Sequence, residues 1–184
     1  MRINNNLHMR ALNEEDLKPY WELVYRESNP EWKKWDAPYY EHKNLSYEDF
    51  LNEKKTSLIQ TDNRWGLFVN NQLIGIVSYY WEHKPSNWLE TGIVIYDSNY
   101  WNGGYGTIFF RNWIEHLFTT LPLVRVGFTT WSGNERMIRL GEKLGMKLEG
   151  RLRKCRLYNG VYYDSIRMGV LREEWEQYKE IVNF

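Results

Sequence analysis

The chain has 184 residues, of which 42% are hydrophobic, and this is enough to build one domain with its own core. Its 24 basic and 24 acidic residues give a net charge of zero, which argues against the basic surface of a nucleic-acid-binding protein. No stretch approaches the ~20 apolar residues of a membrane span, and the N-terminal residues lack the apolar run of a signal peptide. We therefore expect a soluble, cytoplasmic protein without nucleic-acid or membrane partners.

The residue pattern in the first part of the chain predicts one strand followed by two helices. Residues 7–12 alternate between apolar and polar side chains and are expected to form a short strand. Asn13 is a good N-cap for the first helix, although Pro19 lies close enough to its start to shift it. Residues 46–49 read Ser-Tyr-Glu-Asp and resemble a capping box, so a second helix is expected to run to about Gln60.

The middle of the chain predicts a strand-rich region that leads into a glycine-rich loop. Asn70 and Asn71 supply the tight turn of a hairpin, and a third long strand ends near Asp97. The loop follows at residues 100–107, which read "YWNGGYGT". An apolar stripe at helical spacing then predicts a helix over residues 107–121.

The last part alternates strand and helix and ends in a hairpin. After a further strand, Asn134 is placed to cap a helix that Gly145 is suited to end. The dipeptide Asn159-Gly160 predicts the tight turn of the last hairpin, and residues 172–182 are expected to form a helix. The order of elements predicts an α/β or α+β fold with one central sheet, as a single domain over residues 1–184. Helical crossovers on both sides of the strand before Asn134 require at least one parallel strand pairing.

Cysteine and histidine usage offers no covalent or metal chemistry. Cys155 is the only cysteine, so an internal disulfide is impossible and a reducing compartment is the simplest interpretation. No Cys/His motif surrounds it, so we expect a buried, inert thiol. The four histidines stand apart from any acidic or cysteine residue at ligand spacing, and we predict no metal site.

The glycine-rich loop is the strongest local signal for a ligand. Gly103, Gly104 and Gly106 lie between a strand end and a helix start, where free backbone N–H groups and the helix dipole attract anions such as phosphates. The loop lacks the Lys-Ser/Thr of a P-loop and the glycine spacing of a dinucleotide fingerprint. A strand-to-helix turn that binds no ligand remains an alternative at this point.

Three ordered motifs resemble the GNAT superfamily of N-acetyltransferases, in its Rim-type branch of ribosomal-protein-alanine and polyamine acetyltransferases. They are "YDSNYWNGGYGTIFFRNWIEHLF", "NERMIRLGEKLGMKLEGRLR" and "NGVYYDSIRMGVLREEW". In the first, Trp101 stands at the Gln/Arg position of the family's coenzyme-A motif, and Gly104 and Gly106 match its glycines. The resemblance implies a GNAT fold, with a mixed, mostly antiparallel sheet that is splayed between two strands and flanked by helices.

The resemblance also implies acetyl-CoA as cosubstrate and assigns its binding residues. The loop N–H groups would hold the pyrophosphate, the strand before the loop would bond the pantetheine arm through its main chain, and Asn134 would contact that arm or the neighbouring loop. A helix N-cap is the alternative role of Asn134. The residues so assigned are Val94, Ile95, Tyr96, Trp101, Asn102, Gly103, Gly104, Tyr105, Gly106, Thr107 and Asn134.

The implied reaction is direct acetyl transfer from the thioester to a primary amine. Glu90 lies on the strand that leads to the cofactor, and we expect it to act as the base that deprotonates the amine. A solvated glutamate on a polar strand face is the alternative. Many relatives place an acid at positions that correspond to Gly141 and Met137, neither of which can donate a proton. This departure leaves open a module of the same fold that binds acetyl-CoA without turnover.

The acceptor is expected to meet the aromatic segment between the first two helices. Trp32, Trp35 and Tyr39, with nearby acidic residues, could hold a cationic amine through cation–π and carboxylate contacts. These aromatic side chains could instead serve only to pack the helices. A polyamine, an antibiotic-like amine, an amino acid or a protein N-terminus would each fit, and members of the family are often homodimers.

Overall fold

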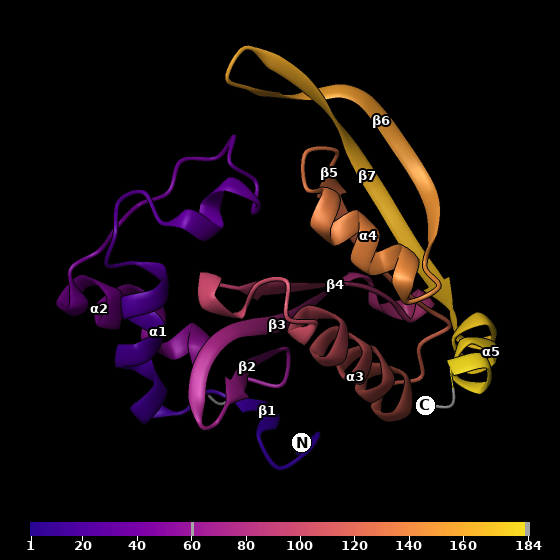
Figure 1. The fold of residues 1–184 in the computed structure, drawn as a ribbon, viewed down its shortest axis with the longest axis horizontal. Helices are drawn as coiled ribbons and strands as arrows, with labels where there is room; N and C mark the ends of the chain where they lie inside the picture. Colours follow the sequence, from indigo (N-terminus) through magenta and orange to yellow (C-terminus); the bar gives the residue numbers. More distant parts are fainter. Residues whose placement is uncertain (60, 183–184) are drawn as a thin grey trace.

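In the computed structural model, which describes residues 1–59 and 61–182, one seven-stranded sheet runs in the order β1-β2-β3-β4-β5-β7-β6 (Figure 1). Its strands are β1 (Leu7–Ala11), β2 (Arg64–Val69), β3 (Gln72–His83), β4 (Trp88–Ile95), β5 (Arg125–Trp131), β6 (Lys147–Tyr158) and β7 (Val161–Leu171). The helices are α1 (Leu17–Val24), α2 (Tyr47–Leu58), α3 (Tyr105–Thr120), α4 (Glu135–Lys143) and α5 (Arg172–Val182). This order of elements confirms the predicted α/β fold with one mixed sheet.

All neighbouring strands pair antiparallel except β4 and β5, which pair parallel. The parallel pairing follows from α3, which carries the chain from the end of β4 back to the start of β5. It covers only three residue pairs, and the last of them joins Glu90 to Gly127. Beyond that point β4 stays paired with β3 as far as Ile95, and β5 stays paired with β7 as far as Trp131. The two strands therefore splay apart, as the resemblance to the GNAT superfamily implied.

Local capping signals set the starts of the helices. Asn13 forms a capping box with Asp16, but the residues between them make a 3₁₀ turn, so α1 begins three residues later than the cap predicts. The Ser46 side chain accepts a hydrogen bond from the Asp49 N–H and starts α2, which ends at Leu58. The predicted end near Gln60 lies outside the described residues.

The two predicted tight turns use residues that tolerate positive φ. Asn70 and Asn71 have φ of 50° and 65°, and Asn159 and Gly160 have φ of 48° and 75°. Positive φ at both central residues is the type I′ geometry that suits the right-handed twist of paired strands. Short-range signals thus determine both hairpins.

Two apolar clusters cover opposite faces of the sheet. Helices α3 and α5 pack on one face, where Trp113 and Trp175 are fully buried. Helices α1 and α2 pack on the other face, over β2, the start of β3 and the end of β4, with Phe50 and Tyr20 at the centre. In Figure 1, α1 and α2 lie at one end of the molecule and α3, α4 and α5 at the other. No helix of the described residues therefore covers the β4–β5–β7 part of this second face.

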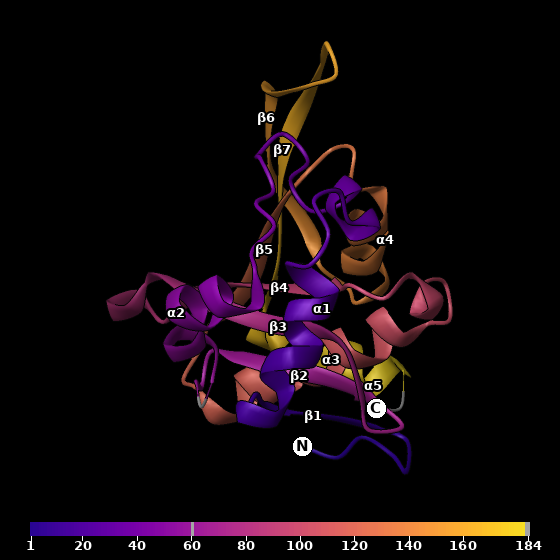
Figure 2. The same ribbon diagram turned by 90° about the vertical axis from the view of Figure 1, so that its left-hand side faces the viewer.

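The hairpin of β6 and β7 projects away from the rest of the molecule (Figure 2). Cys155 lies on β6 in this hairpin and is exposed, so the prediction of a buried thiol is wrong. The physical reason is that β6 is an edge strand of the projecting hairpin, and the basic residues Arg153, Lys154 and Arg156 around Cys155 are consistent with its exposure. Among residues 1–59 and 61–182, none of the helices is long and apolar enough to cross a membrane.

A buried polar relay ties α3 to the splayed strand. The Trp113 indole N–H donates to Thr91 Oγ1 at 2.8 Å, and the Thr91 hydroxyl donates to the Ser78 carbonyl at 2.6 Å. Thr91→Val keeps the shape of the side chain but leaves the indole N–H unpaired, so we expect it to lower the free energy of unfolding by about 1–3 kcal/mol. Chemical denaturation would measure the loss. Thr119→Val, an exposed position in α3, is the matched control, and equal stability of the two variants would contradict the relay.

Candidate functional site

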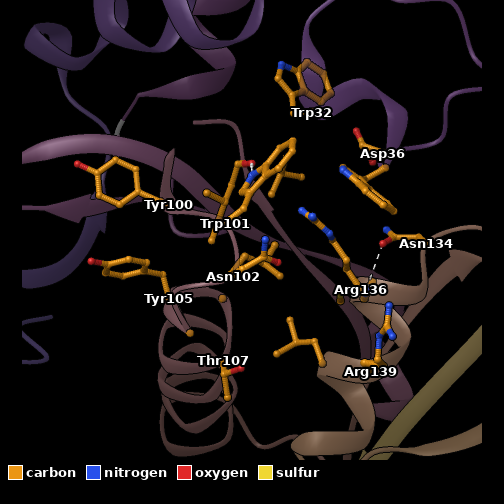
Figure 3. A pocket seen from close by; sticks show the side chains of 18 of the residues that line it. Trp32, Asp36, Tyr100, Trp101, Asn102, Tyr105, Thr107, Asn134, Arg136 and Arg139 are labelled. Atoms are coloured by element: carbon orange, nitrogen blue, oxygen red, sulfur yellow. Dashed lines mark hydrogen bonds between the residues drawn. The ribbon is translucent and has the colours of Figure 1, made fainter. Parts of the chain in front are cut away.

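A cavity of about 620 Å³ lies between the splayed end of β4, the start of α3 and one face of α4 (Figure 3). The loop between α1 and α2 forms its upper wall. The lining residues include Trp32, Trp35, Asp36, Val94, Ile95, Trp101, Asn102, Gly104, Tyr105, Gly106, Thr107, Asn134, Arg136, Met137, Arg139 and Lys143. The structure thus brings together most of the residues that the sequence assigned to the cofactor, from three separate segments, whereas Gly103 and Tyr96 are not in this lining.

The glycine loop forms an anion-binding cradle at the base of this cavity. Gly104 is the N-cap of α3 and has φ of +81°, a conformation that a side chain would strain. The first hydrogen bond of α3 runs from the Ile108 N–H to the Gly104 carbonyl. The N–H groups of Tyr105, Gly106 and Thr107 precede that bond, have no acceptor within the helix and add to the positive end of its dipole. The backbone here is therefore arranged to bind a negatively charged group.

Three basic side chains of α4 face the cradle across the cavity. Arg136, Arg139 and Lys143 follow one another at spacings of three and four residues, which places them on one side of the helix. A negatively charged ligand in the cavity would lie between them and the N-terminus of α3. These three residues were not among those predicted from the sequence, although their helical spacing after the Asn134 cap can be seen there.

A stack of aromatic and cationic side chains closes the top of the cavity. The Arg136 guanidinium lies 4.3 Å from the ring centre of Trp35 and 4.8 Å from that of Trp101, and Figure 3 shows it reaching towards Trp101. The Trp101 indole N–H donates to the Ile95 carbonyl at 2.8 Å. The polar group of Trp101 is therefore engaged with the splayed strand. A Gln or Arg at this position would instead have a polar side-chain end available for a ligand.

The backbone of β4 presents alternate residues to the gap between β4 and β5. The Tyr96 N–H donates to the Ile74 carbonyl at 2.9 Å and so faces β3. Because successive residues of a strand point their backbone groups to opposite edges, Ile95 and Ile93 face the gap. Tyr96 lies outside the cavity lining, and its buried side chain packs with Trp32.

Glu90 stands where the gap begins and is only 2% exposed, so the alternative of a solvated strand-face glutamate is wrong. The Tyr80 hydroxyl donates to Glu90 Oε2 at 3.0 Å, and the Thr129 hydroxyl donates to the same oxygen at 2.7 Å. Two effects raise the pKa of Tyr80: burial of its phenol, which is the larger effect, and the nearby Glu90 carboxylate. Both donors act on Oε2, which fixes the carboxylate from the strands on either side. Glu90 itself is not part of the cavity lining.

A match to the acetyltransferase (GNAT) domain family covers residues 6–147, which is most of the chain. The chain belongs to the GNAT acetyltransferase family. It is 44% identical over 63 residues to the SPbeta prophage-derived uncharacterized N-acetyltransferase YokL of Bacillus subtilis (strain 168), a match over 34% of this chain and 36% of that protein. It is 30% identical over 103 residues to the uncharacterized N-acetyltransferase YnaD of the same organism, over 56% of this chain and 59% of that protein. The chain thus spans less than two thirds of the length of either relative.

Solved structures of acetyltransferases share the fold over nearly the whole chain. Spermidine N-acetyltransferase from Vibrio cholerae, in complex with CoA and spermine, superposes with a TM-score of 0.73 at 22% identity, over 94% of this chain and 99% of that chain. A GNAT-family acetyltransferase from Bacillus anthracis gives a TM-score of 0.72 at 22% identity, over 92% and 96% of the two chains. The resemblance drawn from the sequence motifs is thereby confirmed for family and fold.

Asn134 caps α4 of this GNAT domain, as predicted, because its Oδ1 accepts the Met137 N–H at 3.1 Å. Its side chain also lines the cavity, so the amide nitrogen is left for a ligand. Gly141, at the first of the positions where many relatives carry an acid, is buried, and a Cβ there would lie 2.9 Å from the Phe128 ring. Close packing of α4 on β5 therefore leaves no room for a larger side chain at Gly141.

The three aromatic residues predicted to contact the acceptor do not all lie in the same place. Trp32 and Trp35 line the cavity, whereas Tyr39 lies outside it and packs against Trp131, with the ring centres 6.1 Å apart. The Trp131 indole N–H donates to the Trp35 carbonyl at 2.9 Å and ties this loop to β5. Asp36 is on the cavity wall, and packing around its carboxyl group raises its pKa. The loop thus belongs both to the cavity and to the sheet face behind it.

The cradle can be tested with one added side chain. A Cβ at Gly106 would meet only Ile95 Cδ1, at 3.8 Å, so Gly106→Val should fold. We expect this variant to bind CoA about 10- to 100-fold more weakly in titration calorimetry, because the side chain would hold phosphate oxygens away from the loop N–H groups. Gly150→Val, on β6, is the matched control, since a Cβ there would meet only the Arg167 side chain. A folded Gly106→Val variant with undiminished affinity would contradict the assignment of the cradle.

Proposed function

We propose that the protein is an acetyl-CoA-dependent N-acetyltransferase that moves an acetyl group directly to the primary amine of a small molecule or of a protein N-terminus. One observation carries the proposal: the cradle of backbone N–H groups at the start of α3 opens onto the unpaired edge of β4, and that edge leads to the buried Glu90 carboxylate. Family membership supports the transfer of an acetyl group. It does not select among the amines.

The residues of the cavity fit the parts of a CoA molecule. The N–H groups of residues 102–107 would hold the diphosphate, and the basic face of α4 would neutralise it. The backbone of Ile93 and Ile95, which faces the gap, would bond the pantetheine arm in the manner of a neighbouring strand, with the Asn134 amide close by. The Ile95 carbonyl would exchange the Trp101 indole for this partner. Bound acetyl-CoA supplies the activated acetyl thioester.

Glu90 is the proposed general base. As the nitrogen–carbon bond forms and the carbon–sulfur bond breaks, the amine proton passes to the Glu90 carboxylate, directly or through one water molecule. The leaving thiolate takes a proton from solvent, since neither Gly141 nor Met137 can supply one. Thr129 and Tyr80 hold Glu90 Oε2, which leaves Oε1 to face the amine.

A module that binds acetyl-CoA without turnover is the second candidate, and the absence of an acid at Gly141 and Met137 favours it. Release of free thiol from acetyl-CoA, measured with a panel of primary amines, separates the two candidates. Amine-dependent release establishes the transferase. Tight binding of acetyl-CoA in calorimetry with no release for any amine establishes the second candidate.

We extend the proposal to a single catalytic domain that works in the cytoplasm, where the lone cysteine would stay reduced.

Replacing the base should slow chemistry without disturbing the site. Glu90→Gln keeps an oxygen that can accept the Thr129 and Tyr80 hydrogen bonds, and we expect kcat to fall about 10²- to 10⁴-fold near neutral pH. The deficit should narrow as the pH approaches the pKa of the amine, because a free amine needs no base. Glu53→Gln, an exposed glutamate on α2, is the control. Wild-type turnover of Glu90→Gln across the pH range would remove Glu90 from the mechanism.

Loss of one hydroxyl that positions Glu90 should lower kcat without changing acetyl-CoA affinity. Thr129→Val removes a 2.7 Å hydrogen bond to Oε2, and we expect kcat to fall about tenfold. Thr129→Ser restores the hydroxyl and should restore most of the rate. Steady-state kinetics with both substrates varied would measure kcat and both KM values. A Ser variant as slow as the Val variant would mean that packing, not the hydrogen bond, makes the difference.

A further inference from the structure

The Glu90 carboxylate points to the face of the sheet opposite α3, at the β4–β5–β7 part that no helix of residues 1–59 and 61–182 covers. Directly paired residues share a face, so the register places Tyr80, Glu90 and Gly127 on one side. Thr129 lies on the same side, as its hydrogen bond to Glu90 requires, and brings its partner Arg167 with it. The intervening residues Leu89, Val126, Phe128 and Met168 face the opposite way, into the core under α3. Chemistry at Glu90 is therefore open to an amine that arrives from the face opposite α3.

Open space lies next to Glu90 on this face. Gly92 is two residues further along β4, and a Cβ there would meet no atom within 4 Å. Tyr80 keeps 54% of its surface exposed although its hydroxyl reaches Glu90. The gap between β4 and β5 begins directly after Glu90, where the pairing of the two strands ends. A group above Gly92 would therefore lie next to both Glu90 and the unpaired edge of β4.

An aromatic wall bounds the space on the side of the β6–β7 hairpin. The Trp131 ring lies 4.7 Å from Tyr163 and 6.1 Å from Tyr39, measured between ring centres. Arg156 pairs with Tyr163 across the hairpin, and its guanidinium lies 5.4 Å from the ring centre of Tyr39. This wall is built from three segments of the chain, and it is where the predicted acceptor residue Tyr39 lies.

Two arginines on this face have no acidic partner among residues 1–59 and 61–182. Arg156 donates to a backbone carbonyl. Arg167 is exposed and pairs with Thr129 across the strands. Its charge also partly offsets the burial that raises the pKa of Tyr80, so the two side chains are close. The acids nearby are already engaged or stand apart: Glu90 accepts from Tyr80 and Thr129, Glu149 is paired with Arg125, and Glu82 is exposed on β3. Cationic side chains that lack an acidic partner favour an anionic ligand.

We propose that this face is the acceptor site and that it takes a primary amine that also carries an anionic group, with the amine at Glu90 above Gly92 and the anion at Arg167. The inference rests on the proposed function and names its substrate class. Arg167 is a specificity residue in this scheme, because a guanidinium grips a carboxylate or phosphate in a fixed fork and repels a polyamine. Free amino acids and polypeptide N-termini with an acidic side chain both carry this chemistry.

The test compares anionic amines with matched neutral amines in the full-length wild-type enzyme and in Arg167→Ala. Glycine and glycinamide form one pair, and the amidated tripeptides Asp-Ala-Ala and Asn-Ala-Ala form the other, with spermidine as the polycation. We expect Arg167→Ala to lower kcat/KM for the anionic member about 10- to 100-fold and to leave the neutral member within about twofold. The pair that responds identifies the source of the amine. Arg153→Ala, an exposed arginine on β6, is the control.

Gly92→Val gives a second and independent measurement. The added side chain fills the space above β4, so we expect a raised KM for the amine and an unchanged Kd for acetyl-CoA in calorimetry. A wild-type enzyme that prefers spermidine, or an Arg167→Ala variant with equal effects on both members of each pair, would overturn the inference and leave the transferase intact. If acetyl-CoA binds but no amine releases thiol, the proposed function fails and this inference fails with it.

Discussion

The short parallel pairing of β4 with β5 is the constraint on which the rest of the structure depends. It ends at Glu90 and Gly127, while each strand keeps its antiparallel partner on the other side. Past that point, the β4 backbone groups that face the gap have no hydrogen-bond partner in the described part of the chain, apart from the Ile95 carbonyl that accepts from the Trp101 indole. Unpaired backbone N–H and C=O groups are costly to leave unsatisfied, and this edge is therefore a ready site for an extended, amide-containing ligand.

The two sides of the gap present different chemistry to that ligand and to its reaction partner. On the side of α3 and α4, free N–H groups and arginines gather where a diphosphate would sit. On the other side, a buried carboxylate is held by hydroxyls from β3 and β5 and stands beside open space. Because the gap joins both faces, cofactor and acceptor can approach one another from opposite directions. Such separation allows an acceptor to vary while the cofactor site stays the same.

The fold and the glycine loop at the start of α3 could be predicted from the sequence because their signals are local. Each signal acts within a few residues. The signals are the apolar spacing, the caps at Asn13, Ser46 and Asn134, and the two tight turns of the hairpins. The basic face of α4 was equally local and was overlooked. The burial of Glu90 was not predictable, since a glutamate between a leucine and a threonine reads as a polar strand position until the neighbouring strands are placed.

The sequence by itself determined the order of elements, the glycine cradle at a helix start and the family, because backbone propensity and motif spacing are properties of short segments. Only the tertiary structure decided where β4 and β5 part, which residues hold Glu90, and that Arg167 lies on the same face. Most of those contacts join residues far apart in the sequence, such as Thr129 and Glu90, which are separated by 39 positions, and strand register sets them. Register depends on packing across the whole sheet, and no short stretch of sequence encodes it.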